Sequence, residues 1–353
     1  MAKSWDNASY PKREQVLVQS ANIDSNLTHF PLLLVLTDTN AIANADIASK
    51  RYQVYDYNGN KMSYEEDTYA EGASYANAKI WVGGSSTTVY ASPSGDQNTF
   101  WIYYGYDPGS DQDNATGVFG EYNAVWHMTD LADSSGNSHT LSNDGAVSGA
   151  TGKIGDGYDF EASENDYMNI NDHADWDFSG AFTLEAWANP ETTSADAHIL
   201  WRYSSVDGGI GYFLGIQNSP NCWELTVFIG GSYIQTRSNA APSGGMQHIA
   251  ATRDSSGNTA IYIDGVAQTD TDTLSGAISD AHPLYIGRQD NITKDFDGIL
   301  DEIRIRASDL SAAWLKFQHA NINEADNEQT WSAEEDKPSG SALPLRCLMG
   351  AGL

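Results

Sequence analysis

The chain has 353 residues, 40% of them hydrophobic, and this length is sufficient for two domains that each bury a core. Its 48 acidic and 18 basic residues give a formal net charge of −30, and so negative a field excludes nucleic acid and anionic membranes as partners. Tyrosine (19), tryptophan (10) and glycine (32) are plentiful, which favours short strands and tight turns over helices and predicts an all-β protein.

Cysteine usage and apolar runs indicate neither disulfide staples nor membrane insertion. Cys222 and Cys347 are the only cysteines, too few for a disulfide framework. The longest early apolar run, residues 30–36, is too short to cross a bilayer. The first 15 residues lack the apolar core of a secretory signal, so we expect either a mature form or a protein that bypasses general secretion.

Residues 1–112 are predicted to form an N-terminal β-sandwich domain. Short apolar or alternating runs recur there, each bounded by glycine, serine, proline or aspartate. The strands expected from these runs are residues 15–19, 30–36, 52–57, 79–82, 87–90 and 100–104.

A stretch rich in turn formers, residues 107–116, separates this domain from a second β-rich unit at residues 118–322. Segments 158–161 and 167–170 are interpreted as a hairpin-like pair around an acidic loop. The other expected strands are residues 125–128, 182–187, 199–201, 212–216, 223–228, 248–252, 260–265 and 283–287.

The closing strand follows Gly298, and a change of period then predicts a short helix. Alternation places Ile299, Asp301, Ile303 and Ile305 on one side of the strand and the residues between them on the other. Ser308 or Asp309 can cap the helix. Its buried face is expected to carry Leu310, Ala313, Trp314 and Phe317.

The remainder, residues 323–353, is predicted to be an acidic linker up to residue 341 followed by an apolar tail. The linker has too little apolar content to fold alone. The tail, residues 342–353, is expected to dock on another subunit or another protein rather than join either sandwich.

The order of several motifs carries a family resemblance. The motifs Phe182-Thr-Leu-Glu-Ala-Trp187, Ile261-Tyr-Ile-Asp-Gly265 and Phe296-Asp-Gly-Ile-Leu-Asp-Glu-Ile-Arg-Ile305 resemble a laminin-G-like, concanavalin A-type jelly roll. Upstream, Phe30-Pro-Leu-Leu33 and Tyr55-Asp-Tyr-Asn-Gly59 resemble an uncharacterised β-rich family often found beside such modules. The resemblance implies two tandem β-sandwiches, the second a jelly roll with a short C-terminal helix.

The resemblance also implies a structural calcium ion, because concanavalin-type sandwiches often hold one between carboxylate and carbonyl oxygens. The candidate ligands are Asp301, Asp297, Asp159, Glu161 and Asp166. Alternatively, Asp297 caps a turn, and Asp301 and Glu302 pair with Arg304 or Arg306. The histidines from His127 to His319 show neither HxH nor HxxxH spacing, so the sequence indicates no transition-metal site.

No catalytic set is recognised. Hydrolases of this shape carry E-x-D-x-E or E-x-D-x-x-E on one strand, but the run from Glu164 has Asn169 where the acid should stand. The run from Glu65 to Glu71 is one residue too long and lies in the first domain. The chain is therefore interpreted as non-enzymatic.

Aromatic side chains can stack on the apolar faces of sugars, and several of them occur in neighbouring strands and loops of the second unit. The carbohydrate-binding candidates are Trp201, Tyr203, Tyr212, Trp223 and Tyr233. The alternative is that tryptophans alternating with apolar residues, Trp126, Trp187 and Trp201 among them, belong to the core.

Together these features favour a structural and adhesive protein of a bacteriophage virion surface, capsid- or tail-associated, that displays a lectin-like module. Its expected partners are other virion proteins, further copies of itself and cell-surface polysaccharide. The alternatives are a secreted, extracellular carbohydrate-binding protein of a bacterium and a glycoside hydrolase whose acids are displaced.

Overall fold

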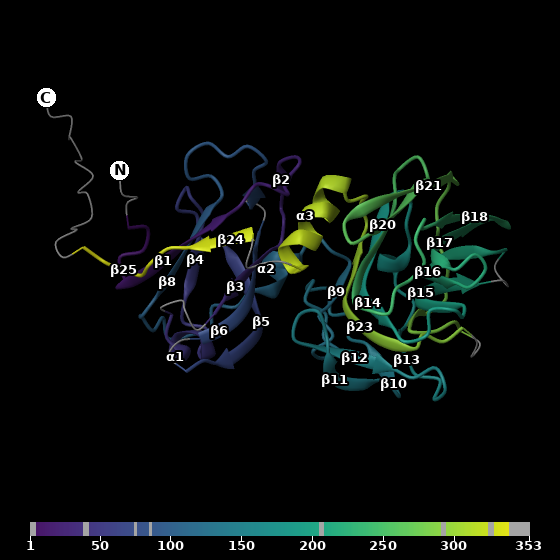
Figure 1. Cartoon of the computed structure of the whole chain (residues 1–353), viewed down its shortest axis with the longest axis horizontal. Coiled ribbons are helices and arrows are strands. Elements are labelled where there is room, and N and C mark those ends of the chain that lie inside the picture. The colour runs from purple at the N-terminus through teal and green to yellow at the C-terminus, as the bar shows by residue number, and fades with distance from the viewer. Residues whose placement is uncertain are drawn as a thin grey trace, which may run out of the picture.

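The computed structural model describes residues 5–37, 42–73, 76–84, 87–204, 208–290, 294–323 and 328–338. It contains two β-sandwiches side by side, with the helix α3 (Ala312–Asn323) between them (Figure 1). The predicted all-β architecture is confirmed. No helix in the described ranges is long and apolar enough to span a membrane.

The N-terminal sandwich packs two main sheets around one core. Its first sheet has the order β24-β1-β8-β4, with β25 also paired to β1, and its second has the order β3-β6-β5. Val16 and Ile102 from the first sheet share a core cluster with Leu34 and Ile80 from the second. The elements are β1 (Lys12–Val18), β2 (Leu27–Thr28), β3 (Leu32–Leu36), α1 (Asn44–Ala48), β4 (Gln53–Tyr55), β5 (Ser63–Glu71), β6 (Ala76–Gly83), β7 (Thr88–Val89) and β8 (Thr99–Tyr104), with β2 and β7 forming a small separate pair.

The C-terminal segment, which the sequence predicted to be an acidic linker, returns to the first sandwich and forms two strands there. The strand β24 (Gln329–Trp331) pairs antiparallel with Val16–Val18, and β25 (Glu335–Asp336) pairs with Lys12 and Arg13. Backbone pairing and ion pairs to Lys12 and Arg13 hold a segment that has little apolar content of its own. The predicted apolar tail, residues 342–353, lies outside the described residues.

The second unit is a jelly roll of two larger sheets, a seven-stranded one (β10-β13-β22-β15-β16-β17-β18) and an eight-stranded one (β11-β12-β23-β14-β19-β20-β21, with β9 beside β23). Its elements, from the entry helix onward, are α2 (Ala115–Phe119), β9 (Ala124–Trp126), β10 (Ser142–Asp144), β11 (Val147–Thr151), β12 (Asp156–Phe160), β13 (Tyr167–Ile170), η1 (Ala174–Trp176), β14 (Phe182–Pro190), β15 (Ala197–Ser204), β16 (Ile210–Gln217), β17 (Cys222–Ile229), β18 (Ser232–Arg237), β19 (Gln247–Arg253), β20 (Asn258–Ile263), β21 (Val266–Thr273), β22 (Leu284–Ile286) and β23 (Gly298–Arg306).

The hairpin expected at residues 158–161 and 167–170 is wrong. The first segment is β12 of the eight-stranded sheet and the second is β13 of the seven-stranded sheet. The acidic loop between them therefore crosses from one layer of the sandwich to the other.

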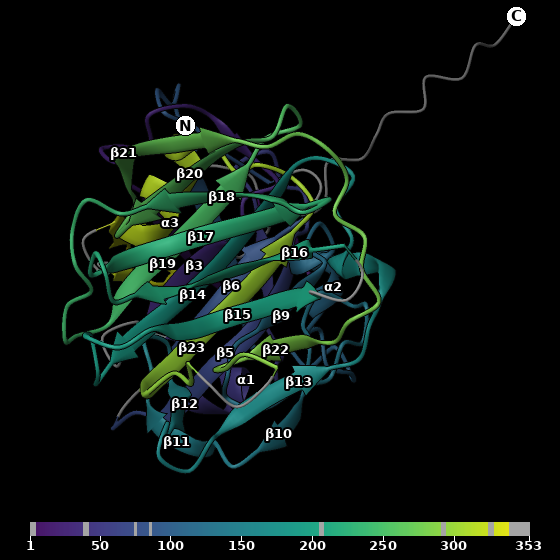
Figure 2. The same cartoon turned by 90° about the vertical axis from the view of Figure 1, so that its right-hand side faces the viewer.

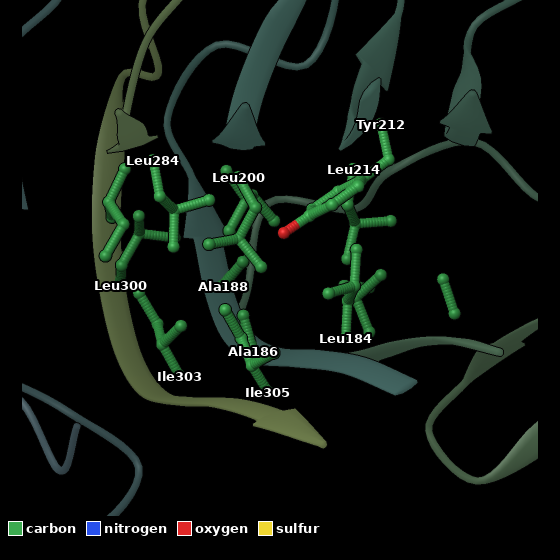
Figure 3. Packing of buried hydrophobic residues seen from close by; sticks show 14 of the residues in the cluster. Leu184, Ala186, Ala188, Leu200, Tyr212, Leu214, Leu284, Leu300, Ile303 and Ile305 are labelled. Atoms are coloured by element: carbon green, nitrogen blue, oxygen red, sulfur yellow. The ribbon is translucent and has the colours of Figure 1, made fainter. Parts of the chain in front are cut away.

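Alternating residues of both sheets fill the jelly-roll core. Leu184, Ala186 and Ala188 lie on one face of β14, because residues two apart in a strand share a face, and they point toward Leu200 and Leu214 of the other sheet (Figure 3). All five side chains are buried, and burial of each leucine contributes about 1.5–3 kcal/mol.

The helix α3 joins the two domains. The predicted helix and its apolar face are confirmed, with Trp314 and Phe317 buried, although the hydroxyl that accepts the N-terminal hydrogen bond belongs to Ser311 rather than Ser308 or Asp309. The ring of Phe30, in the first domain, lies 4.9 Å from that of Trp314 and 5.1 Å from that of Phe317. The helix buries this face against the N-terminal core, so the sandwiches share a packed interface.

Candidate functional site

The seven-stranded sheet turns one face away from the N-terminal domain. In Figure 2 this sheet faces the viewer, and the eight-stranded sheet and the N-terminal domain lie behind it. The inward residues of its strands, such as Leu214, Leu225 and Val227, belong to the core. The residues between them therefore form an outer face that no other layer of the described chain covers.

Aromatic residues of six consecutive strands lie along this outer face, and we call them the outer aromatic row. Trp201 stacks on Phe213 with ring centroids 5.0 Å apart. The contacts continue from Phe213 to Phe228 at 6.0 Å and from Phe228 to Tyr233 at 5.6 Å. In sheet order the row is Tyr167, Tyr285, Trp201, Phe213, Phe228 and Tyr233. Five interstrand steps make it about 24 Å long.

The two ends of the row are more accessible than its middle. Trp201 and Phe213 are only 6% and 8% exposed, whereas Tyr233 is 60% exposed. Phe228 contacts Tyr233, and the ring of Tyr203 lies 4.2 Å from that of Phe228. Both Tyr203 and Phe228 are partly exposed. A ligand would thus reach the rings of Tyr203, Phe228 and Tyr233 first.

At the opposite end, the guanidinium of Arg288 lies 3.5 Å from the ring centre of Tyr167. The ring of Tyr285 is 6.1 Å from that of Tyr167, and both tyrosines are partly exposed. This end therefore combines apolar ring faces with a hydrogen-bond donor, the pair of features that sugar recognition requires.

Under the middle of the row, His198 packs on Trp201 and Phe213 at centroid distances of 4.7 and 4.6 Å. Burial lowers the pKa of His198 to about 3, so its ring is neutral at physiological pH. Within the part of the chain that the structure describes, its Nδ1 and the Nε1 of Trp201 are buried and have no hydrogen-bond partner.

Two of the five predicted sugar-binding residues must be corrected. Tyr212 and Trp223 are fully buried in the jelly-roll core, so they are closed to any ligand. The sequence analysis missed Phe213 and Phe228, which lie on the outer face. The alternation of side chains along each strand could have shown this. Residues two apart point to the same face, so Tyr212 lies on the buried face with Leu214, and Trp223 lies on the buried face with Leu225.

The acidic residues predicted to hold calcium fall into separate places. Three of them, Asp159, Glu161 and Asp297, gather where the acidic loop leaves β12. The pKa of Glu161 is raised by desolvation and by the nearby charges of Asp159 and Asp297. Asp159 has a buried Oδ1 with no hydrogen-bond partner among the described residues, whereas Asp297 already accepts a hydrogen bond from the Thr192 hydroxyl at 2.6 Å. Their carboxylate oxygens are donors of the type that calcium prefers, but the ligand atoms of the three acids do not all lie within 4.8 Å of one another, so an ion bound by all three would have to draw them together.

Asp301 and Asp166 do not fit. Asp301 is fully buried, and its Oδ2 accepts the backbone N–H groups of Lys153 and Ile154 at 2.6 and 2.9 Å. Asp166 is 2% exposed and accepts the backbone N–H of Glu161 at 3.0 Å. Both carboxylates hold loops in place, so the prediction of Asp301 and Asp166 as calcium ligands must be corrected.

A bulge in β23 explains where Asp301 and Glu302 point. Glu302 and Ile303 together lie opposite Ala186, since Asp301 pairs with Trp187 and Arg304 with Glu185. Glu302 adopts a positive φ of 50°. The bulge breaks the predicted alternation and sends both acids to the side facing the N-terminal domain.

There, five side chains from both domains form what we call the interdomain charge cluster, namely Glu65, Asp67, His127, Glu302 and Arg304. Nδ1 of His127 lies 2.7 Å from Glu302 and 3.4 Å from Asp67, and its Nε2 lies 3.3 Å from Glu65. Arg304 donates to Glu302 through Nε at 3.2 Å and stacks on the ring of Trp81. Trp81 in turn donates to Asp67 at 2.7 Å.

The members of this cluster differ sharply in proton affinity. Burial raises the pKa of Asp67 to about 7. Burial acts in the same direction on Glu302, but the charges of His127 and Arg304 outweigh it and lower the pKa of Glu302 to about 2. Burial alone would lower the pKa of His127, yet the surrounding carboxylates raise it well above its usual value.

Carboxylates with separated pKa values resemble the acid and base pair of a hydrolase. Here, however, Asp67 and Glu302 are enclosed, with side chains 0% and 1% exposed, between two packed domains. A polysaccharide could not reach them, so we assign the cluster to domain coupling.

Comparison with known proteins agrees with this fold. Residues 162–316 match the laminin-G model of the concanavalin A-like lectin/glucanases superfamily. This part of the chain is therefore a concanavalin A-like jelly roll. No curated protein matches the sequence.

Several solved structures are partly similar to this chain at low identity. The binding domain of Paraclostridial mosquitocidal protein 1 has 15% identity and a TM-score of 0.48, over 57% of this chain and 52% of its own. Domain 4 of AbnA, a GH43 extracellular arabinanase from Geobacillus stearothermophilus in complex with arabinotriose, has 19% identity and a TM-score of 0.45, over 56% of this chain and 97% of its own. The botulinum neurotoxin serotype G binding domain has 16% identity and a TM-score of 0.46, over 56% and 50%. The chain thus spans about half the length of two of these structures.

Proposed function

We propose that the protein is a non-enzymatic adhesive protein whose jelly roll binds glycans on the outer face of its seven-stranded sheet. The observation that carries the proposal is the outer aromatic row. Ring faces laid side by side on a flat sheet offer repeated stacking positions for pyranose units, and the surrounding polar groups can bond their hydroxyls. A chain of sugars lying across the strands would stack on the accessible rings at the two ends of the row and pass over the nearly buried rings of Trp201 and Phe213.

The charge of the protein narrows the class of glycan. A formal charge of −30 repels polysaccharides rich in uronate, sulfate or phosphate, so a neutral polysaccharide is the better ligand. Contacts with it would be stacking and hydrogen bonding, and its affinity should consequently change little with ionic strength.

We expect Tyr233→Ala and Tyr203→Ala each to weaken binding to a neutral polysaccharide by about 2- to 10-fold, because one stacked ring contributes about 0.5–1.5 kcal/mol. Affinity electrophoresis against a panel of neutral polysaccharides, followed by calorimetry on the best of them, measures this change. Tyr106→Ala is the matched control, since Tyr106 is 43% exposed on the N-terminal domain.

Equal binding by the wild type and the Tyr203→Ala/Tyr233→Ala double variant would refute the assignment of this face. The same incubations also test the absence of catalysis, because a glycoside hydrolase would release new reducing ends from the bound polysaccharide.

We also propose that calcium stabilises the jelly roll through Glu161, Asp159 and Asp297. A ligand that binds only the folded state raises stability by mass action, so a chelator should lower the melting temperature of the wild type. Glu161→Gln should remove this difference, while the exposed acid Asp96 in the first domain provides the control variant Asp96→Asn. A melting temperature indifferent to chelator would exclude a structural calcium.

As the setting for this adhesion we propose the surface of a bacteriophage virion, with a secreted bacterial protein as the alternative. Two rigidly packed β-domains that present a binding face away from their junction suit display on a particle. Capsid or tail genes beside the coding sequence, and the protein in purified particles, would support the virion. A secretory leader in the genomic reading frame would support the alternative.

A further inference from the structure

We propose that His139, His173 and Asp175 bind one first-row transition-metal dication, for which zinc is the best match. The three residues lie on the jelly roll and take no part in the outer aromatic row. His139 ends the loop after β9, while His173 and Asp175 lie at the start of η1. Their ligand atoms all lie within 4.8 Å of one another.

The distances fit a shared ion. In tetrahedral zinc sites with bonds of about 2.0–2.1 Å, two ligand atoms lie about 3.3 Å apart. Nδ1 of His173 is 3.2 Å from Oδ2 of Asp175, close to this edge length. Nε2 of His139 is 2.6 Å from the same oxygen, so an ion that replaces the shared proton needs that contact to open by about 0.7 Å.

The donor set also fits. Two imidazole nitrogens and one carboxylate are typical ligands of zinc, and they leave a fourth position for water. Nδ1 of His173 accepts the backbone N–H of Asp175 at 3.2 Å, so this nitrogen carries a lone pair rather than a proton. A metal would take over that lone pair from a long hydrogen bond.

One side of the cluster is fixed and the other is open. The ring of His139 packs 4.7 Å from that of Trp176, and the carbonyl of His139 accepts a hydrogen bond from Trp126 at 2.7 Å. The His173 side chain is 53% exposed and that of Asp175 is 30% exposed. An ion can therefore enter from solvent, and the two exposed ligands can adjust to it.

Asp67, His127 and Glu302 are the other described residues whose ligand atoms lie within 4.8 Å of one another, and they are less suitable. His127 is held in its protonated form by three carboxylates, and Arg304 already neutralises Glu302. A dication there would displace a buried proton and face a buried guanidinium.

The test is calorimetric titration of the full-length protein with zinc chloride, after chelator treatment and in excess magnesium chloride to fill weak carboxylate sites. We expect one zinc ion per chain in the wild type and in His282→Ala. His282 is a matched control because it lies on the same domain and pairs with Asp280 at 2.9 Å, outside the proposed ligand set. His173→Ala and Asp175→Asn should lose saturable binding.

Cobalt provides a second readout, because a tetrahedral site gives it a strong visible absorption that the His173→Ala variant should lack. His173 is exposed, so an unchanged melting temperature of the metal-free variant shows that its fold is intact. Saturable zinc binding that survives His173→Ala, or no saturable binding by the wild type, would overturn the proposal.

Discussion

Arg304→Met is expected to lower the free energy of unfolding by about 3–5 kcal/mol, the cost of breaking a buried ion pair by removing one partner. Arg304 is 1% exposed and is the only guanidinium in the interdomain charge cluster, where it donates to Glu302 and stacks on Trp81. Without it, the negative charge of Glu302 is balanced by His127 alone. Denaturant unfolding followed by tryptophan fluorescence measures the loss.

The control is Lys316→Met, which removes another ion pair between the domains. Lys316 contacts Asp24 at 2.8 Å, but their side chains are 41% and 56% exposed. Exposed pairs contribute about 0–1 kcal/mol, so this variant should remain near the wild type. Similar losses in both variants would mean that burial does not set the energy of the cluster.

The same cluster gives the unfolding free energy a definite dependence on pH. The pKa of Asp67 is raised to about 7 in the fold, so stability falls as the pH rises from its ordinary pKa toward 7. The pKa of His127 is also raised in the folded protein, so the stability that its protonated ring contributes is lost as the pH rises through that pKa. The decrease in stability therefore continues to more alkaline pH. Glu302, with a pKa of about 2, stays ionised across this window.

We therefore expect the wild type to be more stable near pH 5 than near pH 8 with respect to these groups. Asp67→Asn should flatten the part of this dependence that lies below pH 7. An unchanged profile in that variant would show that Asp67 does not hold its proton in the folded state.

The strands of the jelly roll could be predicted because their signals are local. Runs such as residues 182–187 and 223–228 alternate or remain apolar over the length of one strand, and each lies within a strand of the structure. The bulge at Glu302 could not be predicted in this way, since no Gly or Pro marks it and a residue of this type rarely adopts the positive φ that the structure shows.

The candidate binding face was only partly predictable. Aromatic type alone led to Trp201, Tyr203 and Tyr233, but it also led to Tyr212 and Trp223, which face the core. Leu214 and Leu225 mark the buried faces of their strands. Counting from them in steps of two assigns Tyr212 and Trp223 to the core, and it would have selected Phe213 and Phe228 for the outer face instead.

The charge and metal clusters lie beyond local patterns altogether. Glu65 and His127 come from different domains, and His139 and Asp175 are 36 residues apart in the chain. No spacing rule joins such positions, because only the packing of loops and sheets brings their side chains together. Clusters of this kind follow from tertiary structure.

The return of the chain to the first sandwich could not be predicted from the sequence for a related reason. β24 and β25 form strands because they pair with β1, which lies more than 300 residues earlier in the chain. Truncation after Asn323 is expected to abolish the cooperative unfolding transition of the N-terminal domain. It removes both strands and leaves the edge of β1 unpaired. It also removes Gln329, which accepts from the backbone of Val35 at 3.0 Å and donates to Leu33 at 2.6 Å. The Leu33 carbonyl keeps a hydrogen bond from Asn321 at 3.0 Å, so the backbone N–H of Val35 is the group that loses its partner, at a cost of about 1–3 kcal/mol.

Truncation after Pro338 is the matched control, because it keeps both strands and removes only residues 339–353. We expect it to leave both melting transitions in place while reducing self-association or incorporation into particles, as predicted for a docking tail. Calorimetry of the two truncated chains, with light scattering for association, separates the roles of the two segments. If the chain ending at Asn323 melts like the wild type, β24 and β25 do not stabilise the first domain. If the chain ending at Pro338 associates as the full chain does, the tail is not a docking element.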